Sequence, residues 1–153
     1  MLYTVYLICM VLYLNYGIGF DRLSGFFDPT TLEFLVFPCI LILFVTRSFT
    51  AFGRAFLFAF VRKEYTSSQY RESLLAVRMV MGTALVFGGV CFLIGSVNSI
   101  RALDWSSLDS VGWLCLDLSV AELSLFYALL ICLILLPVYF LLRKEQYAKG
   151  AEK

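Results

Sequence analysis

The sequence contains no histidine among its 153 residues, and only 15% of its residues are charged. Without histidine, the chain lacks the commonest metal ligand of proteins and the usual general base near neutral pH. Its 12 Lys and Arg residues against 11 Asp and Glu residues leave a formal net charge of +1, so the charge gives no reason to expect a nucleic-acid partner.

Cysteine is present but forms no recognisable pattern. The 5 cysteines are scattered, with no C-x-x-C and no paired spacing, and most lie in apolar runs where cysteine acts as a small packing residue. The chain also lacks a nucleophile–base pair, a phosphate-binding loop and paired carboxylates at catalytic spacing. We therefore expect no disulfide framework, no metal site, no cofactor and no enzymatic activity.

Hydrophobic residues make up 61% of the chain, far more than a water-soluble domain of this length can cover with polar surface. A bilayer core needs about 20 apolar residues in helical form. Four segments qualify, which predicts an all-α integral membrane protein with one four-helix domain over residues 1–153. The predicted membrane helices cover about residues 2–20, 31–46, 74–100 and 119–142. The first segment lacks the basic start and cleavage site of a signal peptide, so we expect a retained helix.

The connections between these helices differ in character. We expect a polar loop over 62–73, an outer loop over 101–118 and a tail over 143–153. Asp28-Pro29 is a turn signal, after which Thr30 or Thr31 can cap the second helix.

The second helix is followed by an aromatic-rich helical extension that reaches about residue 61. Arg47, Arg54 and Arg62 fall near one face of this extension, with phenylalanines around the rest. The extension either projects obliquely from the membrane or bends to lie along the interface.

The distribution of basic residues predicts the topology. One side of the membrane would hold 10 basic residues, all within 47–78 or the C-terminal tail, whereas the other would hold Arg22 and Arg101 alone. By the positive-inside rule, both termini are expected to be cytoplasmic.

Polar residues near the outer end of the fourth helix are candidates for function. Ser119 and Glu122 share one helical face, and Ser124 and Tyr127 form a neighbouring stripe. Glu122 is either a solvated residue at headgroup level or a group that faces a pore or a partner. Pro137 removes one backbone hydrogen bond and can bend this helix.

The third helix carries small residues at seven-residue spacing. Gly82, Gly89 and Ser96 lie along one side, which favours close approach of another helix. Thr83 either packs in the same way or offers its hydroxyl to a conduction path.

Three segments carry, in order, short motifs of one known family. The first set of matches to this family lies in the segment FFDPTTLEFLVFPCILILF, at Phe27, Asp28, Pro29 and Leu32. LIGSVNSIRALDWSSLDSVG holds the second set, at Gly95, Leu103, Asp104, Ser107 and Gly112. SVAELSLFYALLICLILLPVYFLLRK holds the third, at Ala121, Tyr127 and Pro137. Together they resemble the MotA/TolQ/ExbB proton-channel superfamily, and its MotA branch in particular.

The resemblance implies a short member of this family, because only residues 47–78 occupy the place of the large cytoplasmic domain. It implies a homo-pentameric ring in the bacterial inner membrane, around a single-helix MotB- or ExbD-like partner or around membrane lipids. The partner would carry the aspartate that is protonated and deprotonated during ion transport.

The resemblance also implies roles for individual residues. Thr83, Ser124 and Tyr127 would line the proton pathway, and Glu122 would concentrate protons at its outer mouth. The structural motif residues would be Asp28, Pro29, Gly95, Asp104 and Pro137.

Other classes of membrane protein share some of these features. A four-helix scaffold or assembly factor that conducts nothing is the alternative, because the proline that opens the family's third helix is absent. A self-contained transporter would need its own carboxylate deep in the bilayer, whereas Glu122 lies near a helix end. We therefore expect a subunit of a proton-driven motor or channel.

Overall fold

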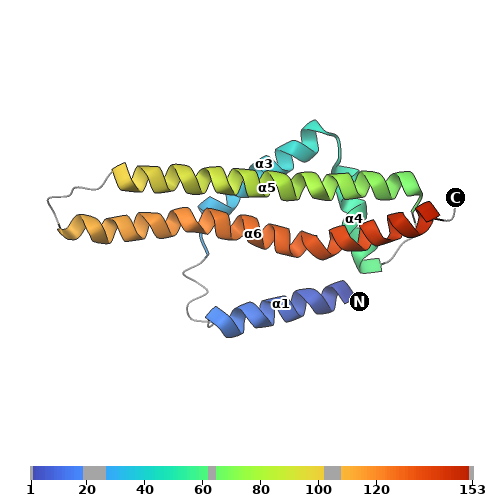
Figure 1. Ribbon diagram of the computed structural model, residues 1–153, viewed down its shortest axis with the longest axis horizontal. Helices are drawn as coiled ribbons and strands as arrows, with labels where there is room; N and C mark the ends of the chain where they lie inside the picture. The colour runs from blue at the N-terminus through green and yellow to red at the C-terminus, as the bar shows by residue number, and fades with distance from the viewer. Residues whose placement is uncertain (1, 19–26, 62–64, 102–107, 152–153) are drawn as a thin grey trace.

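The computed structural model of the chain describes residues 2–18, 27–61, 65–101 and 108–151. Within these ranges every regular element is a helix and none is a strand, which confirms the predicted all-α class. The helices are α1 (Leu2–Ile18), α3 (Pro29–Val45), α4 (Phe49–Val61), α5 (Ser67–Arg101) and α6 (Leu108–Ala151). The long helices α5 and α6 run antiparallel side by side, with α3 against α5 and α1 beside α6 (Figure 1).

Two stretches are long and apolar enough to cross a membrane, namely α5 and residues Leu114–Ala148 of α6. Together α3 and α4 add a third candidate span if the bent pair is counted as one, and Tyr3–Tyr16 in α1 is a shorter apolar helix. The described residues therefore indicate a helical membrane protein with two to three candidate spans. A fourth span stays a prediction.

The start of α5 lies earlier in the sequence than the predicted third membrane helix. Thr66 donates its backbone N–H to the side-chain oxygen of Gln69 at 3.0 Å, and the N–H of Tyr70 donates to the Thr66 carbonyl at 3.1 Å. This is half of a capping box, which begins a helix at a polar segment. The predicted polar loop over 62–73 is therefore wrong for residues 67–73, which belong to α5.

Helix α6 extends beyond the predicted fourth membrane helix at both ends. It begins at Leu108 and ends at Ala151, so the predicted outer loop over 101–118 is wrong for residues 108–118, and residues 143–151 of the predicted tail are helical. Hydropathy marks the residues that suit lipid, whereas a helix continues through polar residues until its backbone is interrupted. Near its end, the Arg143 guanidinium donates to the Tyr147 hydroxyl at 3.4 Å, one turn away.

The chain bends by 111° between α3 and α4, so the helical extension is not a straight continuation of α3. Its position along the membrane interface stays a prediction. Arg47 adopts a φ of 51°, and its N–H donates to the Phe44 carbonyl at 3.1 Å. The N–H of Ser48 donates to the Leu43 carbonyl at 2.9 Å, which completes a Schellman ending of α3. An arginine occupies the left-handed position usually held by glycine, so this ending carries some backbone strain.

Helix α4 joins the other helices at one end of the molecule. Arg54 forms an ion pair with Glu72 of α5 at 3.0 Å, and the Phe58 and Tyr70 rings meet edge to face at 5.3 Å. Tyr3 of α1 meets Phe60 in the same geometry at 5.0 Å. The start of α1, the start of α5 and the end of α6 lie at this end (Figure 1).

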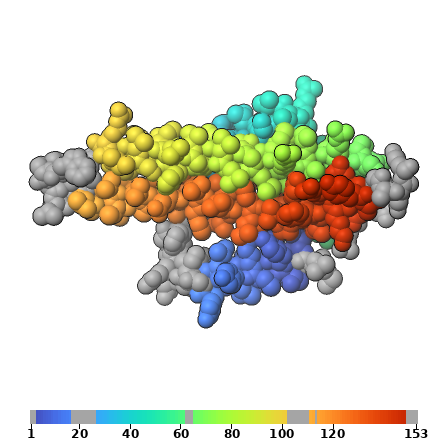
Figure 2. Space-filling model, in the orientation of Figure 1, coloured from blue at the N-terminus to red at the C-terminus, as the bar shows by residue number. Residues whose placement is uncertain are grey.

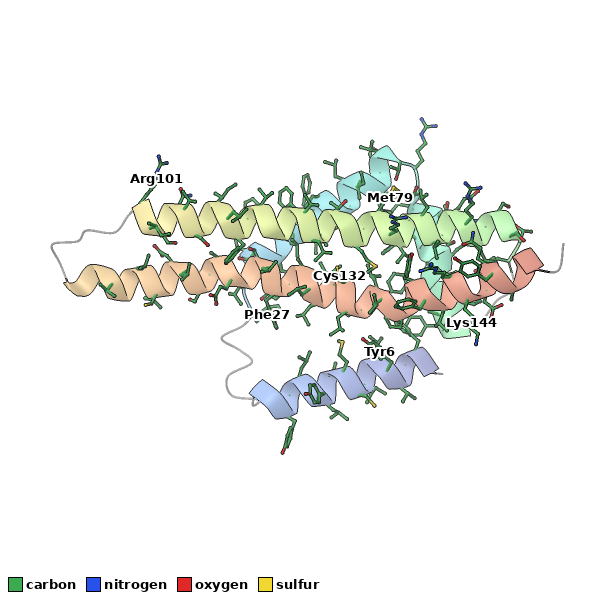
Figure 3. All side chains as sticks on the ribbon, in the orientation of Figure 1. Tyr6, Phe27, Met79, Arg101, Cys132 and Lys144 are labelled. Carbon is green, nitrogen blue, oxygen red and sulfur yellow. The ribbon has the colours of Figure 1, made fainter. Side chains whose placement is uncertain are left out.

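The two ends of the long helical pair are well separated. Arg101 lies at the end of α5 far from α4, whereas Lys144 lies near α4 (Figure 3). The arrangement of the chain is thus compatible with a topology in which residues 47–78 and the end of α6 share one side of a membrane.

Two tyrosines attach α1 to α6 next to Pro137. Because proline has no backbone N–H, the Leu133 carbonyl four residues earlier loses its helical donor. The Tyr6 hydroxyl donates to this carbonyl at 3.0 Å, and the Tyr3 hydroxyl donates to the neighbouring Ile134 carbonyl at 3.2 Å. The proline thus leaves an acceptor in α6 that α1 satisfies.

Replacement of the Tyr6 hydroxyl tests this attachment. Tyr6→Phe is expected to lower the free energy of unfolding by about 1 kcal/mol, because it leaves the Leu133 carbonyl without a donor. In a Pro137→Ala background the restored backbone N–H satisfies that carbonyl, so the same change should cost clearly less. A double-mutant cycle from unfolding in detergent micelles measures the difference. Equal costs in both backgrounds would contradict the proposed pairing.

Candidate functional site

Small residues bring α5 and α6 into close contact. A Cβ atom added to Gly88 would lie 2.5 Å from the Ala128 Cβ and 2.9 Å from the Ser124 carbonyl oxygen. A Cβ atom on Gly95 would lie 2.7 Å from the Ala121 Cβ. These three distances are too short for a Cβ atom, so glycine is required at both positions for this spacing of the two backbones.

The glycines that make this contact differ from the predicted ones. A Cβ atom on Gly82 or Gly89 would meet nothing within 4 Å, and the Ser96 hydroxyl donates to the Phe92 carbonyl of its own helix at 2.8 Å. The predicted packing stripe is therefore wrong for contacts within the described chain. The stripe that packs is formed by Gly88 and Gly95, on a different face of α5.

The N-terminus of α3 is attached to α6 through Asp28 and Tyr127. Asp28 is the N-cap of α3, its side chain accepts from the N–H of Thr30 at 3.1 Å, and Pro29 occupies the first turn. The Tyr127 hydroxyl accepts from the Asp28 N–H at 2.8 Å. The Asp28-Pro29 pair marks the start of α3, with Asp28 in extended backbone conformation as the N-cap in place of Thr30 or Thr31.

The Asp28 carboxylate is held in its ionised form. The Thr31 hydroxyl donates to it, and this bond, together with the N–H groups of Thr30 and Thr31, lowers the pKa of Asp28 despite some desolvation. The capped start of α3 and the α5–α6 contact together fix three helices around one hollow.

That hollow is a groove of about 510 Å³ between α3, α5 and α6. We call this hollow the acceptor groove. Its polar lining residues come from all three helices and are Thr31, Asn98, Ser99, Asp117 and Ser124. Apolar side chains complete its walls, among them Leu35, Cys91 and Val120.

The hydroxyl groups that line this groove donate hydrogen bonds to carbonyl or carboxylate oxygens of the chain itself. Ser124 Oγ lies 2.7 Å from the Ala121 carbonyl and 3.1 Å from the Gly88 carbonyl, and Ser99 Oγ donates to the Gly95 carbonyl at 2.8 Å. Thr31 donates to the Asp28 carboxylate. Carbonyl and carboxylate oxygens only accept, so the direction of each bond is fixed. The three oxygens can therefore offer only lone pairs to a ligand.

The three hydroxyl oxygens thus suit a ligand that donates hydrogen bonds or carries positive charge, whereas the amide of Asn98 can both donate and accept. The carboxylate of Asp117 adds negative charge to the same lining, and its side chain is exposed. Within the described residues, no three His, Cys, Asp or Glu side chains gather as metal ligands. Protons, water, ammonium groups and protonated carboxyl groups match this chemistry best.

The structure separates the four residues predicted to line an ion pathway. Ser124 lines the acceptor groove, and Tyr127 is buried beside it against Leu35 and Ala128. Thr83 lines a different hollow between α3 and α5. Glu122 is exposed on α6 and does not line the groove.

The predicted motif residues also differ in their places. Asp28, Pro29 and Gly95 lie around the groove as described above, and Pro137 lies next to the attachment of α1. Asp104 lies outside the described residues.

Sequence reasoning assigned none of four groove residues to a functional site, namely Thr31, Asn98, Ser99 and Asp117. One signal was available, because Asp117, Ala121, Ser124 and Ala128 fall on one helical face at spacings of four, three and four. A face that combines a carboxylate, a hydroxyl and small residues indicates a protein contact next to a polar site.

Adjacent glycines of α5 allow a matched test of the helix contact that supports the groove. Gly88→Ala is expected to lower the free energy of unfolding by about 1–3 kcal/mol, because its methyl group overlaps Ala128 and a backbone carbonyl. Gly89→Ala should leave stability unchanged or raise it slightly, since its Cβ meets nothing and alanine is the better helix former. Unfolding in detergent micelles compares the two, and equal effects would contradict the contact.

No protein-family model, no curated protein and no solved structure matches this chain. The acceptor groove, the close α5–α6 contact and the exposed apolar helices are therefore the features on which a functional proposal rests.

Proposed function

We propose that the chain is a MotA/TolQ/ExbB-like membrane subunit that takes part in proton transfer through the acceptor groove. The observation that carries the proposal is the direction of the hydroxyl bonds. Thr31, Ser99 and Ser124 all donate to oxygens of the chain, so their own oxygens keep lone pairs that can accept from a proton donor in the groove. A groove of this kind favours the protonated form of a partner's carboxyl group over the charged form.

The mechanism follows from that preference. A protonated carboxyl group on a partner helix donates a hydrogen bond to the side-chain oxygen of Ser124 or Ser99. After this proton passes to water at the mouth of the groove, the carboxylate loses the hydrogen bond and meets the negative charge of Asp117, so the partner is driven out of the groove. Protonation and deprotonation would thus move the partner between two positions, which is the action of a proton-driven motor or channel.

Exposed apolar side chains support an assembly in the membrane. In the view of Figure 2, the ends of α5 and α6 farthest from α4 are not covered by the other described helices. Leu93 of α5 is 61% exposed and Leu116 of α6 is 59% exposed. In the proposed assembly, copies of the chain and lipid cover these faces around a single-helix partner. Four spans, cytoplasmic termini and a bacterial inner-membrane location belong to the same proposal.

A non-conducting scaffold is the second candidate, and one observation favours it. Ser124 and Tyr127 already serve contacts within the chain, to Gly88 and Asp28, and Thr83 lies away from both. A scaffold would keep these contacts for stability alone.

The proton pathway is tested by flux through the purified complex in liposomes, read with a pH-sensitive dye under an imposed potential. Asp117→Asn and Ser124→Ala are expected to lower the flux about tenfold or more, because each removes a group that distinguishes the protonated from the charged form of the partner's carboxyl group, and a tenfold change corresponds to about 1.4 kcal/mol. Ser96→Ala is the control for Ser124, because the Ser96 hydroxyl also bonds a carbonyl of its own helix but Ser96 does not line the acceptor groove. Loss of flux with Glu122→Gln but not with Asp117→Asn would overturn the groove as the pathway.

The assembly is tested separately by native mass spectrometry of the gently solubilised complex. Five copies with one or two smaller chains are the expected composition. A monomer or dimer without a companion chain would reject the ring and leave the scaffold as the better interpretation.

A further inference from the structure

A second hollow, of about 670 Å³, lies between α3 and α5 and is separate from the acceptor groove. Apolar side chains form most of its walls, including Ile42 from α3 and Leu75 and Val86 from α5. Its lining also contains Arg78, Gly82 and Thr83. We call it the apolar hollow.

Glycine keeps part of this hollow open. A Cβ atom on Gly82 would meet nothing within 4 Å, so the space over this residue belongs to no side chain of the described chain. A leucine there would fill the hollow without meeting α3 or α6 at its Cβ. The open space runs along the face of α5 in the direction of the helix.

A polar hollow of about 480 Å³ adjoins the apolar one and shares Leu75 with it. Its lining is hydrophilic and comes from α5 and α6: Ser67, Ser68, Arg71, Glu72 and Gln146. The two hollows thus form one surface that is polar at the start of α5 and apolar farther along it.

Two arginines mark the boundary between these parts. Arg71 and Arg78 are seven residues apart, so they share one face of α5 and lie about 10 Å apart along its axis. Glu72, which lines the polar hollow, is paired with Arg54 at 3.0 Å. Arg78 has no ion pair with any described residue, and no acidic side chain lines the apolar hollow.

We propose that this surface binds one anionic phospholipid. The phosphate lies against the Arg78 guanidinium, with Arg71 and the hydroxyls of Ser67 and Ser68 around the headgroup. One acyl chain occupies the apolar hollow over Gly82 and alongside Val86. Guanidinium matches phosphate with two parallel hydrogen bonds, and a basic hollow between membrane helices is a recurring form of anionic lipid site.

The change from polar to apolar lining favours a lipid over a protein helix as the occupant. A lipid has its charge at one end and hydrocarbon along the rest, which is the order found from Arg71 and Arg78 to Val86. The site does not depend on proton transfer, so it can exist whether or not the proposed function is correct.

Native mass spectrometry of the detergent-purified chain, titrated with phosphatidylglycerol or phosphatidylcholine of the same acyl chains, tests the proposal. We expect one phosphatidylglycerol to bind about tenfold more tightly than phosphatidylcholine, as a charge-assisted pair implies. Arg78→Gln should remove this preference. Arg101→Gln is the matched control, because Arg101 is also exposed but lies at the other end of α5.

The glycine variants test the acyl-chain part of the site. Gly82→Leu should weaken binding of both lipids, whereas Gly53→Leu, at another glycine whose Cβ meets nothing within 4 Å, should weaken neither. Equal affinity for the two lipids in the unaltered chain, or equal losses from Arg78→Gln and Arg101→Gln, would overturn the proposal. So would a co-purified protein that Gly82→Leu displaces.

Discussion

The close approach of α5 and α6 is the constraint on which the rest of the structure depends. At Gly88 and Gly95 the two backbones are nearer than any side chain would permit, and only Ala121, Ser124 and Ala128 of α6 face them. Because lipid is as apolar as leucine, burial of hydrocarbon does not hold membrane helices together, and close packing and interhelical hydrogen bonds take its place. The bond from Ser124 to the Gly88 carbonyl is available only at this short spacing. The acceptor groove is then the space left where α3 meets this pair.

The peripheral helices are attached to that pair by polar groups near helix interruptions. Helix α3 is joined at its N-cap, where Tyr127 accepts from the Asp28 N–H, and α1 is joined where Pro137 has released a carbonyl for Tyr6. Both attachments satisfy backbone groups that would otherwise lack partners in an apolar environment, where each such group costs several kcal/mol. The same logic applies to the Schellman ending at Arg47, which pairs the last carbonyls of α3 before the chain bends into α4. Helix ends and breaks therefore determine where the helices meet.

The sequence was sufficient for the all-α class, the start of a helix at Asp28-Pro29 and the apolar core of each long helix. Helix ends were predicted less well, because hydropathy reports preference for lipid and not the continuity of the backbone. The Thr66–Gln69 capping box was a local signal for the start of α5 that hydropathy does not detect. The packing stripe was assigned to Gly82 and Gly89 instead of Gly88 and Gly95, since both sets have seven-residue spacing and the sequence does not show which one faces α6. The pairing of Tyr6 with Leu133 joins residues 127 positions apart, which no local pattern reveals.

The direction of the hydrogen bonds in the acceptor groove connects packing with chemistry. A serine placed on an open helix face can either donate or accept, and so does not distinguish a protonated from a deprotonated ligand. Once Ser124 donates to the Gly88 carbonyl, and Ser99 to that of Gly95, this choice is removed and both oxygens offer lone pairs only. Ser99 and Ser124 each have a carbonyl of their own helix as acceptor, at 2.8 Å and 2.7 Å, so the preference for proton donors is set largely within α5 and α6. The close contact of the two helices adds the Gly88 carbonyl as a second acceptor for Ser124. Separation of the two helices would therefore remove the Gly88 acceptor and change the shape of the groove, whereas Ser124 would keep the Ala121 carbonyl as its acceptor.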